Sequence, residues 1–179
     1  MPPASGTTIG RRPRRRALAL LALTAATGCL PFPTTPSLGG LTGVTVNAEG
    51  RLTLVLAWCG RPPDGVAVYH RSDESLVDQA RLTAPPLPGS MAYLDLEKIS
   101  PGWSVAEGDL EFPRERKYMA AGYDAKRNAR MYGVVFTGES GEKVRPGQVI
   151  VTEYREPEKD GHDVLLSTAE FTARVPHYC

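Results

Sequence analysis

From residue 42 onward, hydrophobic and polar residues alternate along much of the chain, and this pattern predicts strands. Val44 and Val46 alternate with polar residues in 42–47. In 51–58, apolar residues recur at every second position, namely Leu52, Leu54, Leu56 and Trp58. A period of two is typical of a strand with one buried face. The turn Asn47-Ala48-Glu49-Gly50 lies between the two runs, which favours a hairpin.

Further runs of strand character are separated by turn residues, at 66–70, 77–83, 91–96, 117–123, 130–137, 148–154 and about 164–174. Proline and glycine interrupt 97–116, which we expect to be an irregular crossing between sheets. No segment shows a helical period over three turns. The pattern predicts an all-β fold, a single antiparallel β-sandwich of roughly eight strands over residues 41–179. It resembles immunoglobulin-like sandwiches in architecture only.

The first 28 residues have the layout of an export signal. Five arginines within 11–16 precede an apolar stretch at 17–27, which is too short to span a membrane as a helix. The stretch ends in Ala26-Thr27-Gly28-Cys29, which resembles a bacterial lipoprotein signal. The resemblance implies that Cys29 becomes the lipid-carrying first residue of the mature protein. The partner is then the membrane, and the location is the outer face of the cytoplasmic membrane.

Two alternatives remain open for this segment. An ordinary cleaved signal would use Ala26 and Gly28 as the small residues before the cut. The arginines also leave open whether export is general or twin-arginine, although Pro13 interrupts them. In either case residues 29–40 form a linker rich in proline and glycine, which we expect to hold the domain away from the membrane.

The three cysteines support the lipid anchor. Cys29, Cys59 and Cys179 make an odd number, which calls for an explanation in an exported protein. With Cys29 assigned to lipid, Cys59 and Cys179 remain as a pair in a compartment where disulfides persist. We therefore expect a Cys59–Cys179 disulfide; the alternative is two free buried thiols.

The charge of the exported part differs from that of the whole chain. The signal holds five of the 21 basic residues and none of the 20 acidic ones, which leaves 16 against 20, a net charge of −4. A nucleic-acid-binding protein would show a basic excess, so no nucleic-acid partner is expected.

Motifs of known chemistry are missing from the sequence. It has neither a nucleophile elbow nor a phosphate-binding glycine loop, and we expect no cofactor. Three histidines, His70, His162 and His177, would each need a serine partner in the fold to act as a base. Asp95 and Glu97 share a face of one predicted strand, but glycosidases usually draw their acid pair from different elements.

The acidic segment 156–163 is the one candidate for a metal. Asp160 and Asp163 flank Gly161 and supply the oxygen ligands that calcium prefers. Lys159 would oppose the ion, and a solvated turn explains the same residues.

A hairpin rich in arginine and tyrosine is the candidate binding surface. The residues concerned are Tyr123, Lys126, Arg127, Arg130 and Tyr132. Tyrosine and arginine dominate interface hot spots, although a solvated turn beside half-buried tyrosines accounts for the same pattern. The sequence thus favours a non-enzymatic binding module with an envelope protein or polymer as its partner. A small envelope hydrolase is the alternative.

Overall fold

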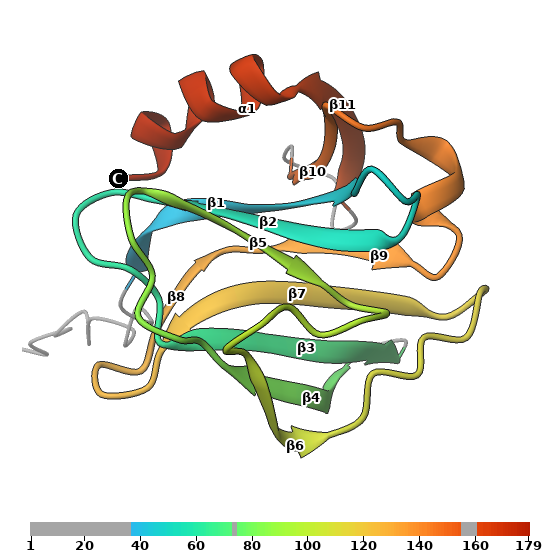
Figure 1. Ribbon diagram of the computed structural model, residues 1–179, viewed down its shortest axis with the longest axis horizontal. Coiled ribbons are helices and arrows are strands. Elements are labelled where there is room, and N and C mark those ends of the chain that lie inside the picture. Colours follow the sequence, from blue (N-terminus) through green and yellow to red (C-terminus); the bar gives the residue numbers. More distant parts are fainter. Residues whose placement is uncertain (1–36, 73–74, 155–160) are drawn as a thin grey trace, which may run out of the picture. The chain divides into compact units, whose positions relative to one another are not determined.

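A computed structural model describes residues 37–72, 75–154 and 161–179, and its framework is a curled β-sheet (Figure 1). One layer contains the strands around the N-terminal hairpin. These are β1 (Ser37–Val46), β2 (Leu52–Trp58), β5 (Met91–Asp95), β10 (Gln148–Glu153) and β11 (His162–Ser167). The all-β prediction is confirmed.

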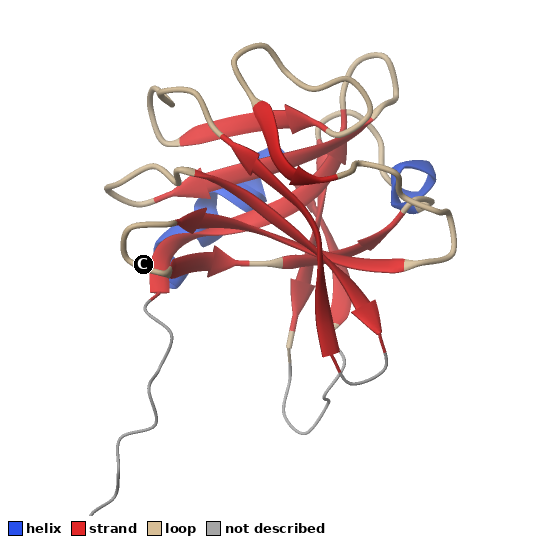
Figure 2. Cartoon of the chain, turned by 90° about the horizontal axis from the view of Figure 1, so that it is seen from below, coloured by secondary structure: helices blue, strands red, loops and turns tan. Residues whose placement is uncertain are grey.

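The second layer lies below the first in Figure 1 and is built around the β3–β4 and β7–β8 hairpins. Its strands are β3 (Gly65–Ser72), β4 (Ser75–Thr83), β6 (Ser104–Gly108), β7 (Lys117–Asp124), β8 (Ala129–Tyr132) and β9 (Val134–Thr137). Figure 2 views the chain from below and shows the strands crossing one another as the sheet curls.

Strand β1 joins the two layers because different parts of one edge pair with different strands, β8 and β10. Its N-terminal half pairs with β8 in parallel, through Ser37 and Leu41, whereas Val44 pairs with Ile150 of β10 in antiparallel fashion. The register shifts between Ser37 and Leu41, where Gly40 has a φ of 147° that side-chain-bearing residues rarely adopt. The sheet is therefore mixed, and the expected single antiparallel, immunoglobulin-like sandwich is not confirmed.

Two hydrophobic cores follow from strands that are buried on both faces. The alternating residues that the sequence singled out in β2, from Leu52 to Trp58, point into the larger core between the layers. The residues between them, Val55 and Ala57, are also buried and belong to a second core. That core is closed by the short helix α1 (Thr168–Arg174), whose Phe171 is fully buried.

The C-terminal segment differs from its prediction. The strand expected at about 164–174 ends at Ser167, and α1 follows. Ser167 and Glu170 form a capping box: the backbone N–H of Glu170 donates to the Ser167 hydroxyl, and the N–H of Ser167 donates to the Glu170 carboxylate. Seven residues are too few for a helical period to show in the sequence.

Two other predicted boundaries also shift. The expected irregular crossing at 97–116 contains strand β6, which pairs with β4. Strand β1 begins at Ser37, so the last four residues assigned to the linker belong to the sheet. A short 3-10 helix, η1 (Ser140–Lys143), precedes β10, and another, η2 (Val175–Tyr178), follows α1.

The predicted disulfide between Cys59 and Cys179 is present. It ties the C-terminal residue to the end of β2, across a sequence separation of 120 residues. Within the described part of the chain, no helix has the length and hydrophobicity that a membrane span requires.

Candidate functional site

The outer face of the second layer brings part of the predicted binding surface together. Val66 and Val68 of β3 point into the core, so Tyr69 lies on the opposite face. On the neighbouring hairpin, Tyr123 of β7 stands opposite Arg130 of β8. The three side chains line a recess of about 130 Å³. Its full lining is Ala67, Tyr69, Arg81, Tyr123, Asp124, Ala125, Asn128, Ala129 and Arg130.

Arg130 is the cation of this recess for which the described residues provide no ionic partner. Its guanidinium carbon lies 4.9 Å from the centroid of the Tyr69 ring, a cation–π contact. No carboxylate among the described residues forms a salt bridge with it. Within the described ranges, the one partner of its positive charge is therefore the Tyr69 ring.

Arg81 contributes a second guanidinium, which is only partly paired. Its Nη2 lies 3.3 Å from Asp78, and its Nε lies 3.6 Å from Glu107, a distance too long for a hydrogen bond. The Nε atom is buried and has no hydrogen-bond acceptor within the described residues. Both carboxylates are more than half exposed, and such exposed pairs contribute little. Arg81, which lines the recess, thus keeps one donor that no described residue satisfies.

The two tyrosines remain protonated and can donate. Burial raises the pKa of Tyr69 above its usual value, although Arg130 and Arg81 act in the opposite direction. Burial also raises the pKa of Tyr123, against the effect of Arg81. At neutral pH both phenols are therefore neutral hydrogen-bond donors.

The loop between β7 and β8 is held by an internal ion pair. Asp124 accepts hydrogen bonds from the backbone N–H of Arg127, at 3.1 Å, and from its Nη1, at 2.9 Å. Burial acts to raise the pKa of Asp124, but these bonds outweigh it and the pKa is lowered. Arg127 is therefore committed to the loop, and Lys126 lies exposed outside the recess lining.

Tyr132, the remaining residue of the predicted surface, lies elsewhere. Its ring centroid is 4.6 Å from that of Tyr178 and 6.5 Å from that of Tyr154. The structure thus brings Tyr123 and Arg130 together but places Tyr132 in a separate aromatic cluster.

Sequence reasoning missed Tyr69 and Arg81. The inward alternation of Val66 and Val68 could have placed Tyr69 on the outer face. No signal in the sequence shows that β7 pairs with β3, which is what brings Tyr123 and Tyr69 to the same recess.

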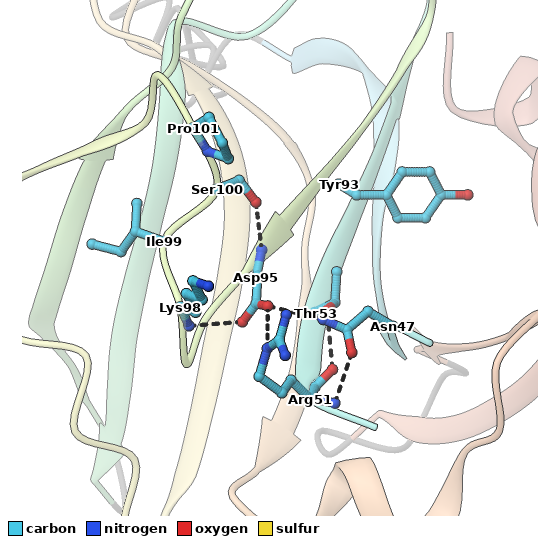
Figure 3. Close-up of a pocket in the computed structure, with 9 residues that line it drawn as sticks. All are labelled: Asn47, Arg51, Thr53, Tyr93, Asp95, Lys98, Ile99, Ser100 and Pro101. Atoms are coloured by element: carbon cyan, nitrogen blue, oxygen red, sulfur yellow. Dashed lines mark hydrogen bonds and ion pairs between the residues drawn. The ribbon is translucent and has the colours of Figure 1, made fainter. Parts of the chain in front are cut away.

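A larger, shallow groove of about 390 Å³ lies on the β2–β5 side and is centred on Asp95 (Figure 3). One oxygen of Asp95 accepts from Arg51 Nε at 2.6 Å and from Asn47 Nδ2 at 2.9 Å. The other accepts from the backbone N–H groups of Glu97 and Lys98. Burial acts to raise the pKa of Asp95, but these contacts lower it. Asp95 thus has a structural role, because its hydrogen bonds hold together the segments that line the groove.

Both carboxylates of the predicted acid pair, Asp95 and Glu97, accept hydrogen bonds from the backbone. Glu97 Oε1 accepts from the backbone N–H of Leu52 at 2.8 Å, while Asp95 holds the turn that follows β5. A glycosidase needs one carboxyl group free to protonate a leaving group and another free for water or the sugar. These two carboxylates instead satisfy backbone donors.

The three histidines lie on different elements. The ring of His70, on β3, has its centroid 6.4 Å from that of Tyr118, and His162, on β11, has its Nε2 3.8 Å from a carboxylate oxygen of Glu153. His177 is exposed on η2. Cys59 and Cys179 are consumed by the disulfide and are not nucleophiles.

Of the two candidate calcium ligands, only Asp163 is described; Asp160 lies outside the described residues. Asp163 lines a recess together with Lys117 and Lys143, whose charges oppose a cation. In the part of the chain that the structure describes, no three acidic, histidine or cysteine residues are placed to hold a metal ion. Calcium binding stays a prediction without structural support.

No family model, curated protein or solved structure matches this chain. The functional argument therefore rests on the geometry of the site.

Proposed function

We propose that this protein is a lipid-anchored, extracytoplasmic binding module, held to the membrane through Cys29, that acts without catalysis. The binding surface is the outer face of β3, β7 and β8, where the recess lies. A single observation carries the proposal: the Arg130 guanidinium lies over Tyr69 with no carboxylate partner among the described residues. A cation whose charge no neighbour balances is available to a ligand.

A small envelope hydrolase is the alternative. The carboxylate pair that would serve sugar hydrolysis is bound to backbone N–H groups, which favours the binding module over that alternative. The proposal also keeps the comparison with immunoglobulin-like sandwiches, but only for their architecture. Both arrangements have two layers of strands, and one outer face can bind a partner.

The anchor is tested by replacing Cys29 with Ser in cells that produce the full chain. Lipid attachment requires the thiol, so the variant is expected to lose incorporation of labelled fatty acid and to leave the membrane fraction or remain unprocessed. Replacing Cys59 and Cys179 with Ser is the matched control, because it removes the two disulfide-bonded cysteines but leaves Cys29. Processed Cys29→Ser protein that stays in the membrane fraction would refute the anchor.

The binding surface is tested by co-sedimentation of the full chain with purified envelope material. Lys126→Glu with Arg130→Glu is expected to reduce the bound fraction severalfold, since it reverses two charges on one hairpin. Arg116→Glu with Arg145→Glu makes the same change of charge at exposed positions outside the recess and is expected to bind normally. An equal loss in both double variants would indicate a general charge effect and would contradict a defined surface.

A further inference from the structure

We infer that the recess between Arg81 and Arg130 binds an oxyanion, either the phosphate or the carboxylate group of a larger ligand. That the ligand belongs to the cell envelope rests on the proposed function. The binding of an oxyanion in the recess does not depend on it. The residues that carry it are Tyr69, Arg81, Tyr123 and Arg130.

The first argument is the set of donors. Arg81 Nε is buried and has no acceptor within the described part of the chain. An unsatisfied buried donor destabilises a protein unless an acceptor reaches it, and an anionic oxygen is the strongest acceptor available. Arg130 adds a guanidinium fork whose planar geometry matches carboxylate and phosphate oxygens.

The second argument comes from the phenols. The Tyr69 residue is only 4 % exposed, and its hydroxyl has no hydrogen bond to any described residue, although it lines the recess. Because burial keeps both Tyr69 and Tyr123 protonated, each hydroxyl can donate to an anion. Two phenols and two guanidiniums on one recess form a set in which donors predominate.

The third argument concerns the one carboxylate in the lining. Asp124 would repel an anion if it were free, but both of its oxygens accept hydrogen bonds from Arg127. This pair neutralises Asp124 and holds the β7–β8 loop at the edge of the recess. Arg127 is therefore a positioning residue for the recess and need not contact the ligand.

The fourth argument is size. The recess has a volume of about 130 Å³, well below the roughly 300–1,000 Å³ of pockets that hold whole small molecules. That volume suits one phosphate or carboxylate group and is too small for a whole sugar or nucleotide. The recess thus recognises a charged group, while the rest of the ligand lies across the surrounding sheet face.

The test is a titration of the full chain, purified in neutral detergent and followed by the Nε–H signals of Arg81 and Arg130 in nuclear magnetic resonance spectra. Sodium phosphate and sodium acetate are added separately at millimolar concentrations, with sodium chloride holding the ionic strength constant. Either anion is expected to shift both signals in a saturable way. Absence of a saturable shift with both anions would overturn the inference.

Variants separate the recess from general electrostatics. Arg130→Gln and Tyr69→Phe are each expected to weaken binding about tenfold or more, since each removes a donor to a charged group. Arg145→Gln removes the same charge as Arg130→Gln at an exposed position outside the lining, and should bind within about twofold of the unaltered chain. Equal weakening by Arg145→Gln and Arg130→Gln, with none by Tyr69→Phe, would also overturn the inference.

A third arm identifies the source of the anion. Vesicles of phosphatidylglycerol that compete with phosphate at the two signals, where phosphatidylcholine vesicles do not, would assign the group to a lipid headgroup. Phosphate or acetate binding without such competition would assign it to a soluble or polymeric ligand. Envelope co-sedimentation that depends on Lys126 and Arg130, in a chain that binds neither anion, would uphold the proposed function and reject this inference alone.

Discussion

At the scale of single residues, two carboxylates stabilise turns by accepting hydrogen bonds from backbone N–H groups. Asp95 and Asp124 each accept from an arginine and from backbone N–H groups at a turn. The contacts at both sites lower the pKa of the carboxyl group below its usual value. Asp95, a candidate acid in the sequence, is thus committed to structure, whereas Arg81 and Arg130 on the outer face are incompletely paired among the described residues.

Asp95→Asn is expected to lower the free energy of unfolding by about 1–3 kcal/mol at neutral pH, because the partners of a buried acceptor are left poorly satisfied. Because the pKa of Asp95 is lowered from 3.8, its contribution is full well above that value and is lost as pH falls through the folded-state pKa. The difference between the two proteins should therefore shrink between about pH 5 and about pH 2 in urea denaturation.

Glu49→Gln is the matched control for that measurement. Glu49 belongs to the same hairpin and also pairs with Arg51, but at 3.4 Å and with its side chain 62 % exposed. It should change stability by less than about 0.5 kcal/mol. A constant difference between the Asp95→Asn and unaltered proteins across the acid range would contradict the linkage to this carboxylate.

At the scale of elements, close approach decides where the helix docks. Gly43 of β1 lies beneath α1, and a Cβ added there would stand 2.4 Å from Val149 Cγ1 and 3.1 Å from Phe171 Cε2. The absence of a side chain at this position lets Phe171 reach the sheet and close the second core. Glycine in a strand commonly marks such an approach.

Gly43→Ala is accordingly expected to destabilise the chain by about 1–3 kcal/mol, since the new methyl group overpacks the second core. Chemical denaturation measures the change. Gly141→Ala is the control, because a Cβ there would meet its nearest neighbour at an ordinary 3.4 Å. Equal stability of Gly43→Ala and the unaltered protein would contradict this prediction. It would show that α1 can shift to accommodate the methyl group without loss of stability.

At the scale of the whole molecule, the disulfide closes the chain into one large loop. Cys179 is the last residue, and its bond to Cys59 holds η2 and α1 against the first layer. Cross-linking residues so far apart in sequence restricts the unfolded chain more strongly than a short loop does.

Replacing both Cys59 and Cys179 with Ser is expected to lower the free energy of unfolding by about 5 kcal/mol in the chain-entropy model. Thermal unfolding under oxidising conditions measures the loss, and Cys29→Ser serves as a control that leaves the bond intact. Addition of a reductant should bring the unaltered chain to the stability of the double variant. Free thiols at Cys59 and Cys179 in the purified protein, detected by non-reducing mass spectrometry, would contradict the pairing.

The sequence predicted those features that depend on local pattern. The alternation from Leu52 to Trp58 identified β2 and the face it turns toward the larger core, and cysteine parity identified the disulfide. The parallel pairing of β1 with β8 depends on segments about 90 residues apart, which a local pattern cannot encode. The recess was half predicted for the same reason: Tyr123 and Arg130 share a hairpin, while Tyr69 and Arg81 join them only through the pairing of β3 with β7 and β4.

The divided edge of β1 has a mechanical consequence. A pull from the preceding segment would act on Ser37, along the axis of a strand that is hydrogen-bonded to three others. Seven consecutive residues, Gly40 to Val46, are in register with β2, so extraction would have to shear this ladder together with the pairings to β8 and β10. Bonds loaded in shear break collectively, whereas bonds that are unzipped break one at a time. A tether attached at this end would thus load the pairings of β1 with three strands at once.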